Sequence, residues 1–117
     1  MERLPKQIKR HLDRLVGQAY ENELSQALEK LAAQVDEWRA GRIGAGKLAH
    51  WIHQYDTGPL REMFKRYNSG YHELQITSAL QAGLLHKNDV PQEVWPYLQN
   101  AIAFIEDTLD EDDVDDE

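Results

Sequence analysis

The chain contains no cysteine among its 117 residues, which excludes disulfide scaffolds, thiolate zinc sites and cysteine nucleophiles. Its uninterrupted apolar runs are also much shorter than the roughly 20 residues that a bilayer-spanning helix needs. Residues 1–15 carry five bases and no apolar run, so we expect no signal peptide and a cytoplasmic protein. No segment alternates apolar and polar residues between hairpin turns, so we expect no strands.

Acids are abundant instead, and they are concentrated at one end. The chain holds 13 Lys and Arg against 21 Asp and Glu, for a net charge of -8, and nine of these acids follow Ile105, where no base occurs. Such a block of like charges cannot bury apolar surface. We therefore predict one domain over residues 1–109 and a disordered acidic tail over residues 110–117. The tail is expected to keep the protein soluble, with a basic partner as the alternative.

Residues 5–40 are predicted to form one long helix. Pro5 suits a first turn, and Gly41 suits the left-handed position that ends a helix. The mean spacing of the apolar residues is about 3.8, larger than the helical repeat of about 3.6, so we expect the apolar stripe to move around the helix and to touch different neighbours along its length. Gly17 leaves open a bend, because glycine weakens a helix by about 1 kcal/mol. The apolar residues are Leu4, Ile8, Leu12, Val16, Tyr20, Leu24, Leu28, Leu31, Val35 and Trp38.

Shorter helices are predicted over residues 47–55, 59–67, 71–85 and 89–109. Residues 56–59 (Asp-Thr-Gly-Pro) indicate a turn, Ser69 a helix cap, and Pro96 a division of the last helical region. Together with the long helix, these segments predict an all-α, single-domain bundle of about five helices. The default place of its aromatic side chains is the core, although their number also suits an oligomer interface. These are Trp38, Trp51, Trp95, Tyr55, Phe64, Tyr67 and Phe104.

The segment from Gly41 to Lys47, Gly-Arg-Ile-Gly-Ala-Gly-Lys, matches the spacing of a phosphate-binding loop. That loop needs a Ser or Thr after the lysine to hold magnesium, and a strand before the first glycine. Here Leu48 follows the lysine, and a predicted helix precedes the loop. We therefore interpret the segment as a turn between two helices.

A second candidate is formed by His50, His53 and Asp56, spaced three residues apart. Imidazoles one helical turn apart can share a divalent metal ion, and the carboxylate offers a third ligand. We expect the three side chains to lie on the side of their helix opposite Leu48 and Ile52. The sequence nominates no further ligand, so we favour solvated polar residues over a metal site.

A third candidate is the pair Arg66 and His72, separated by five residues near a helix break. In this respect the chain resembles the HEPN ribonucleases, which are small and helical. The resemblance implies that Arg66 stabilises a scissile phosphate and that His72 transfers a proton. The family usually places a small polar residue after the arginine, whereas Tyr67 follows here. This activity is the alternative function.

The fourth candidate is a basic face at the N-terminal end, away from Ile8, Leu12 and Leu15. It suits contact with phosphates, with a partner, or with the acidic tail, although Asp13 interrupts it. No nucleic-acid motif accompanies it. We therefore favour protein contact over nucleic acid, and we expect no membrane contact. The face consists of Arg3, Lys6, Lys9, Arg10 and Arg14.

None of these patterns combines a nucleophile with a neighbouring base, and none nominates a cofactor. The sequence therefore favours a non-catalytic helical interaction module over an enzyme. We expect an accessory or regulatory protein that binds a protein partner or self-associates, most simply as a homodimer. A long first helix favours self-association, because about 35 residues extend roughly 50 Å, more than a compact body of this size would cover.

Overall fold

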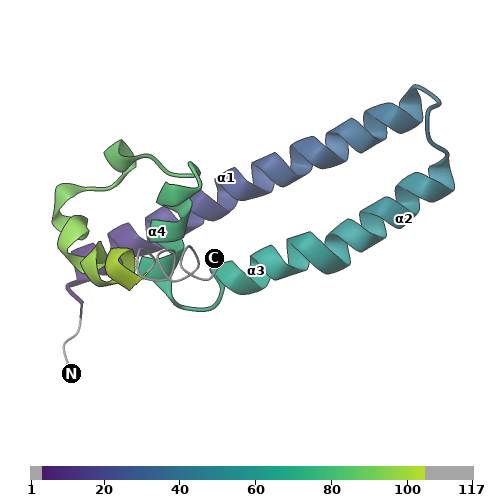
Figure 1. Cartoon of the computed structure of the whole chain (residues 1–117). Helices are drawn as coiled ribbons and strands as arrows, with labels where there is room; N and C mark the ends of the chain where they lie inside the picture. The colour runs from purple at the N-terminus through teal and green to yellow at the C-terminus, as the bar shows by residue number, and fades with distance from the viewer. Residues whose placement is uncertain (1–3, 105–117) are drawn as a thin grey trace, which may run out of the picture. The chain divides into compact units, whose positions relative to one another are not determined.

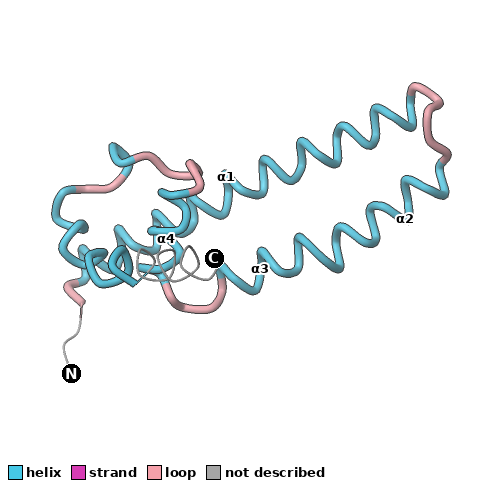
Figure 2. The backbone as a smooth tube through the Cα atoms, viewed as in Figure 1, coloured by secondary structure: helices cyan, strands magenta, loops and turns pink. Residues whose placement is uncertain are grey.

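The computed structural model describes residues 4–104, and every regular element in that range is helical (Figures 1 and 2). The all-α prediction is therefore confirmed. The described residues form four α-helices, α1 to α4; a π-helical turn joins α2 to α3, two 3-10 turns follow α4, and residues 95–104 are helical as well. No helix within residues 4–104 combines the length and the apolar character needed to cross a bilayer. The predicted acidic tail, residues 110–117, lies outside the described residues.

Helix α1, Lys6–Arg39, is a single element of 34 residues that continues through Gly17, so the long helix is confirmed. Gly41 ends it with φ of 77°. The amide of Gly41 donates to the carbonyl of Trp38 at 3.0 Å, and the amide of Arg42 donates to that of Glu37 at 2.9 Å. These two bonds form a Schellman motif, which satisfies the last carbonyls of the helix and needs a left-handed residue at the glycine.

The turn predicted over residues 56–59 is wrong. Helix α2, Ala45–Tyr55, passes through a π-helical turn, Asp56–Leu60, directly into α3, Arg61–Tyr67. Pro59 has no amide to donate and would clash within an α-helical turn, and the wider π turn accommodates its ring. The hydroxyl of Thr57 donates to the carbonyl of His53 at 2.8 Å, which gives that carbonyl a second donor beside the amide of Asp56. The second and third predicted helices therefore form one continuous helical limb.

Helix α4, His72–Gln81, is shorter than the predicted range of 71–85. Gly83 ends it with φ of 77°, and the amide of Leu84 donates to the carbonyl of Ala79 at 2.9 Å. This is a second Schellman ending, which the sequence analysis missed. The N-cap position of α4 is Tyr71 and not the predicted Ser69, whose hydroxyl donates to the carbonyl of Arg66 at the end of α3.

The last helical region also differs from its prediction. Lys87–Asp89 and Gln92–Val94 are 3-10 turns, and the carboxylate of Asp89 accepts the amide of His86 at 2.8 Å. The helix over residues 95–104 follows. Pro96 is therefore in the first turn of a helix, where the missing amide has no partner to lose, and it does not interrupt one.

The described residues divide into two compact units, one of which combines residues 4–19 with residues 70–104. Its core comes from one face of α1, from α4 and from the segments that follow. Leu12, Ile76, Val94 and Leu98 are completely buried there. Glu93 links the second 3-10 turn to α1, because it accepts from Gln7 at 3.1 Å and lies 2.8 Å from Nε2 of His11. This unit has the interior of an ordinary small helical domain.

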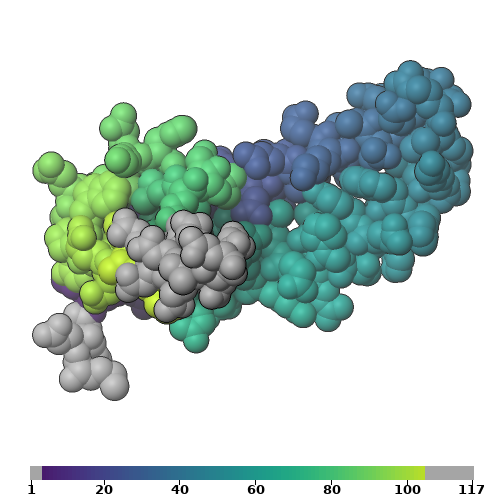
Figure 3. Space-filling model, in the orientation of Figure 1, coloured from purple at the N-terminus to yellow at the C-terminus, as the bar shows by residue number. Residues whose placement is uncertain are grey.

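The other unit, Tyr20–Ser69, is a helical hairpin. Its first limb is the C-terminal part of α1, and its second limb is α2, the π turn and α3, running antiparallel to the first (Figure 1). Figure 3 shows the side chains of the two limbs meeting along the hairpin. The buried apolar residues of this unit are Ala27, Leu48, Met63 and Tyr67. Two helices side by side form one layer, whereas stable domains are built from two or more.

Candidate functional site

Several aromatic side chains that were predicted to lie in the core are exposed. Phe64 is 57% exposed, and Trp38 and Phe104 are exposed as well, whereas Tyr67 is buried. The core prediction is therefore wrong for three of the seven aromatic residues. Apolar spacing along a helix indicates which side is apolar, but it does not indicate whether another element covers that side.

An apolar stripe with few neighbours follows the first limb of the hairpin. Leu24, Leu28, Leu31 and Val35 recur at intervals of four, three and four residues, which is the alternation of a coiled-coil seam. Leu28 is 55% exposed, and the other three are half-buried. The stripe therefore packs on the second limb along one edge and faces outward along the other.

A matching stripe follows the second limb. Ile52 and Phe64 are exposed, and Leu60 is half-buried. Phe64 follows Leu60 by four residues, so the two side chains lie on one side of the limb. Ile52 is in α2, and Leu60 ends the π turn that joins α2 to α3. We call the two stripes together the apolar face of the hairpin; it consists of Leu24, Leu28, Leu31, Val35, Ile52, Leu60 and Phe64.

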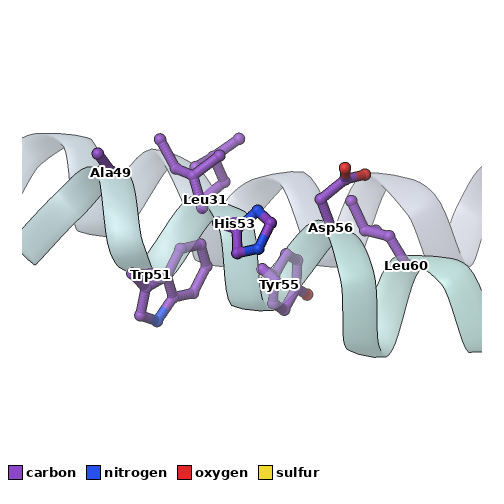
Figure 4. A pocket seen from close by; sticks show the side chains of 8 residues that line it. Leu31, Ala49, Trp51, His53, Tyr55, Asp56 and Leu60 are labelled. Atoms are coloured by element: carbon purple, nitrogen blue, oxygen red, sulfur yellow. The ribbon is translucent and has the colours of Figure 1, made fainter.

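A cavity of about 370 Å³ connects the two stripes at the middle of the hairpin (Figure 4). Leu31 of α1 lines it together with Ile52 and Leu60 of the second limb. His53 and Asp56 are the polar residues at its edge. Its lining is therefore mainly apolar, and it includes one residue of the first stripe, Leu31, and two of the second, Ile52 and Leu60.

The hairpin carries its polar contacts on another side of α3. Arg66 follows Phe64 by two residues, or about 200° around the helix. It donates to Glu23 of α1, with 2.6 Å between Nη2 and Oε2. The hydroxyl of Tyr67 donates to the same carboxylate at 2.8 Å, and its ring stacks on Tyr20 at 4.9 Å. These contacts connect the two limbs on a side of α3 that is turned away from Phe64.

The structure changes the expected position of His53 and Asp56. They line the same cavity as Ile52 and Leu60, whereas we predicted the side of the helix opposite Ile52. Consecutive residues of a helix are only about 100° apart, so His53 borders the same cavity as Ile52, and Asp56 follows Ile52 by about one turn. His50 is exposed on α2. Within residues 4–104, no three His, Asp or Glu side chains group in a way that could hold a metal ion.

The two residues that suggested a ribonuclease belong to different units of the chain. Each has a carboxylate neighbour within its own unit: Arg66 pairs with Glu23, and Nδ1 of His72 lies 3.6 Å from Asp13. A phosphate bound by Arg66 would have to compete with the carboxylate of Glu23. The proposal that the two side chains cleave RNA stays a prediction.

The basic face of the N-terminal helix is exposed where the structure describes it. Lys6, Lys9, Arg10 and Arg14 are exposed, whereas Ile8, Leu12 and Leu15 of the same helix are buried, as we predicted. Nη2 of Arg14 lies 3.2 Å from Nδ1 of His11. Arg3 lies outside the described residues. A partner for this face stays a prediction.

The glycine-rich segment that resembles a phosphate-binding loop connects two helices, as we predicted. Helix α2 begins after Gly44, so Gly46 and Lys47 lie within its first turn. Arg42 of the same segment forms a bidentate ion pair with Glu37 at the end of α1. The pair holds the pKa of the Glu37 carboxyl below its ordinary value, because Arg42 donates hydrogen bonds to the ionised form.

No family model matches the chain, and neither a curated protein nor a solved structure matches it. The candidate site therefore depends on the geometry of this chain alone. The apolar face is its strongest feature, and the sequence analysis missed it as a surface. The four–three spacing of Leu24, Leu28, Leu31 and Val35 was the signal that could have indicated it, because that spacing is typical of helices that pack on a partner helix.

Proposed function

We propose that this chain is a non-catalytic helical interaction module, an accessory or regulatory protein that binds another protein chain through the apolar face. The observation that carries the proposal is the exposure of Leu28 and Phe64 on a hairpin that buries few apolar residues. Contiguous apolar surface is uncommon on soluble monomers and is typical of sites that bind proteins or membranes. Its position on two rigid helices favours a helical partner.

The charges around the face support a protein partner. The hairpin carries exposed bases, among them Lys30, Arg61 and Lys65, but residues 20–69 hold seven Asp and Glu against seven Lys and Arg and therefore have no excess of positive charge. A membrane-binding helix usually flanks its apolar side with lysines and arginines that contact anionic lipids. A helical partner needs no such charges, because its own apolar side chains supply the contact.

Site-specific photo-crosslinking tests this proposal. A photoreactive residue at position 28 is compared with one at position 26, which lies about 200° away on the same helix. Both positions are exposed. We expect covalent adducts with a protein, identified by mass spectrometry, at position 28 and not at position 26. Equal labelling at both positions, or none at position 28, would contradict the proposal.

A charge-matched pair of variants gives an independent readout. Leu28→Glu with Phe64→Glu adds two acids to the apolar face, whereas Gln26→Glu with Gln54→Glu adds two acids elsewhere on the same limbs. Gln26 and Gln54 are exposed. We expect the first variant to lose its partner and the second to retain it. Circular dichroism of both variants verifies that the helices are intact.

A further inference from the structure

We infer that the occupant of the apolar face is a second copy of this chain, packed face to face on the first with the α1 helices antiparallel. This inference rests on the proposed function and names the partner. The arrangement joins two hairpins into a four-helix bundle around a two-fold axis. Such a bundle supplies the second layer that the hairpin lacks within residues 20–69.

The size of the face agrees with what a stable dimer needs. Residues 20–39 of α1 extend about 30 Å at 1.5 Å per residue, and two packed helices are about 20 Å wide. The side of the hairpin that carries the apolar face therefore has a footprint of about 600 Å² per copy, and a pair of copies packed over that whole side buries about 1,200 Å². Specific interfaces begin at about 1,200 Å² of total buried surface. A two-fold dimer is thus feasible without any further contact, at the lower end of stable sizes.

The charges at the two ends of the stripe select the direction of pairing. Glu21 precedes Leu24 by three residues, and Arg39 follows Val35 by four, so each flanks one end of the stripe. The two residues are 18 positions apart, or five full turns, and therefore lie on the same side of α1, about 27 Å from each other. Both are exposed.

A two-fold axis perpendicular to α1 brings each Glu21 opposite the partner's Arg39. The midpoint of Glu21 and Arg39 falls between Leu28 and Leu31, which is also the middle of the apolar stripe. One axis through that point therefore pairs the apolar residues and both sets of opposite charges at once. A two-fold interface requires such self-complementarity, because the same patch contributes both halves.

Charge reversal tests this arrangement in the full chain. We expect sedimentation equilibrium to show a wild-type dimer at micromolar concentration. Glu21→Arg alone and Arg39→Glu alone should each weaken the dimer roughly tenfold, because each creates two like-charge contacts. The double variant should restore the wild-type affinity. Glu21 and Arg39 are too far apart on one helix to interact within a copy, so restoration reports contact between copies.

Three results would overturn the inference. A wild-type protein that stays monomeric at all concentrations would exclude a second copy as the occupant. A dimer that persists in the variant with Leu28→Glu and Phe64→Glu would exclude the apolar face. Two reversals whose effects add, without restoration, would exclude the antiparallel pairing.

The same measurements separate this inference from the proposed function. If the protein is monomeric and position 28 still forms adducts with a different protein, the second copy is the wrong occupant and the interaction module stands. If position 28 forms no adduct and no dimer is detected, both fail. The variant with Gln26→Glu and Gln54→Glu should remain dimeric, which verifies that two added acids do not separate the copies by themselves.

Discussion

Tyr67 of α3 donates its hydroxyl to the carboxylate of Glu23 on α1, with 2.8 Å between the two oxygens. Tyr67 is buried as a residue, and its hydrogen bond to Glu23 is partly buried. The same carboxylate accepts from Arg66, whose guanidinium lies at the surface. Glu23 therefore connects the two limbs of the hairpin through one buried and one exposed donor.

Removing the carboxylate should destabilise the fold chiefly through Tyr67. We expect Glu23→Ala to lower the free energy of unfolding by about 1–3 kcal/mol, because a buried hydroxyl loses its acceptor. The exposed ion pair with Arg66 contributes less, about 0.2–1 kcal/mol. Urea denaturation measures both effects, with Glu29→Ala, an exposed acid of the same helix, as the control. A cycle with Tyr67→Phe should show coupling, and strict additivity would contradict the assignment.

The same tyrosine predicts a loss of stability at alkaline pH. Burial raises the pKa of the Tyr67 hydroxyl, and its hydrogen bond to Glu23 raises the pKa further. Because the pKa in the folded state exceeds that of the unfolded chain, about 10, the contribution to stability is fully present below pH of about 10 and is lost as the pH rises above it. Tyr67→Phe should show a shallower loss of stability in this range, measured by urea midpoints.

Tyr71→Phe is the control for this pH dependence, because the ring of Tyr71 is 65% exposed. We expect this variant to follow the wild-type curve above pH of about 10. An alkaline loss of stability that is unchanged by Tyr67→Phe and reduced by Tyr71→Phe would contradict the role given to the buried hydroxyl.

Replacing glycine by alanine should raise the stability of the fold at Gly17 and lower it at Gly83. An added Cβ would meet no atom within 4 Å at Gly17 or at Gly83, so packing does not distinguish the two sites. Gly17 lies within α1, where alanine is favoured by about 0.5–1 kcal/mol. Gly83 has φ of 77°, where alanine costs about 1–2 kcal/mol. Thermal unfolding should show a higher midpoint for Gly17→Ala and a lower one for Gly83→Ala, and a shared sign would contradict this account.

Features of the fold that depend on local spacing could be predicted from the sequence. The length of α1 and its end at Gly41 follow from the apolar repeat and from one left-handed glycine. The buried positions Ile8 and Leu12 follow from the same repeat. Each of these features is decided by interactions within a few residues along the chain, which the order of the residues specifies directly.

Features that depend on alternative hydrogen bonding or on distant neighbours could not be predicted from the sequence. Pro59 indicated a turn, because a proline removes one helical hydrogen bond, but the wider π turn accommodates its ring and the limb continues. The exposure of Trp38 and Phe64 depends on whether another element covers the apolar side of a helix. Periodicity does not contain that information, which is why the apolar face emerged from the structure.

The environment of Arg66 argues against RNA cleavage by this protein. The guanidinium of Arg66 lies 2.6 Å from the carboxylate of Glu23. A scissile phosphate would have to displace this partner and approach its negative charge, so the pair opposes the role that the resemblance gives to Arg66. We therefore expect the purified protein to leave labelled single-stranded and structured RNA intact. Glu23→Gln removes the competing charge and serves as a sensitised variant, which should also be inactive. Cleavage by the wild type that disappears in both Arg66→Ala and His72→Ala would contradict a purely non-catalytic module, whereas cleavage that survives both substitutions would point to a contaminating nuclease.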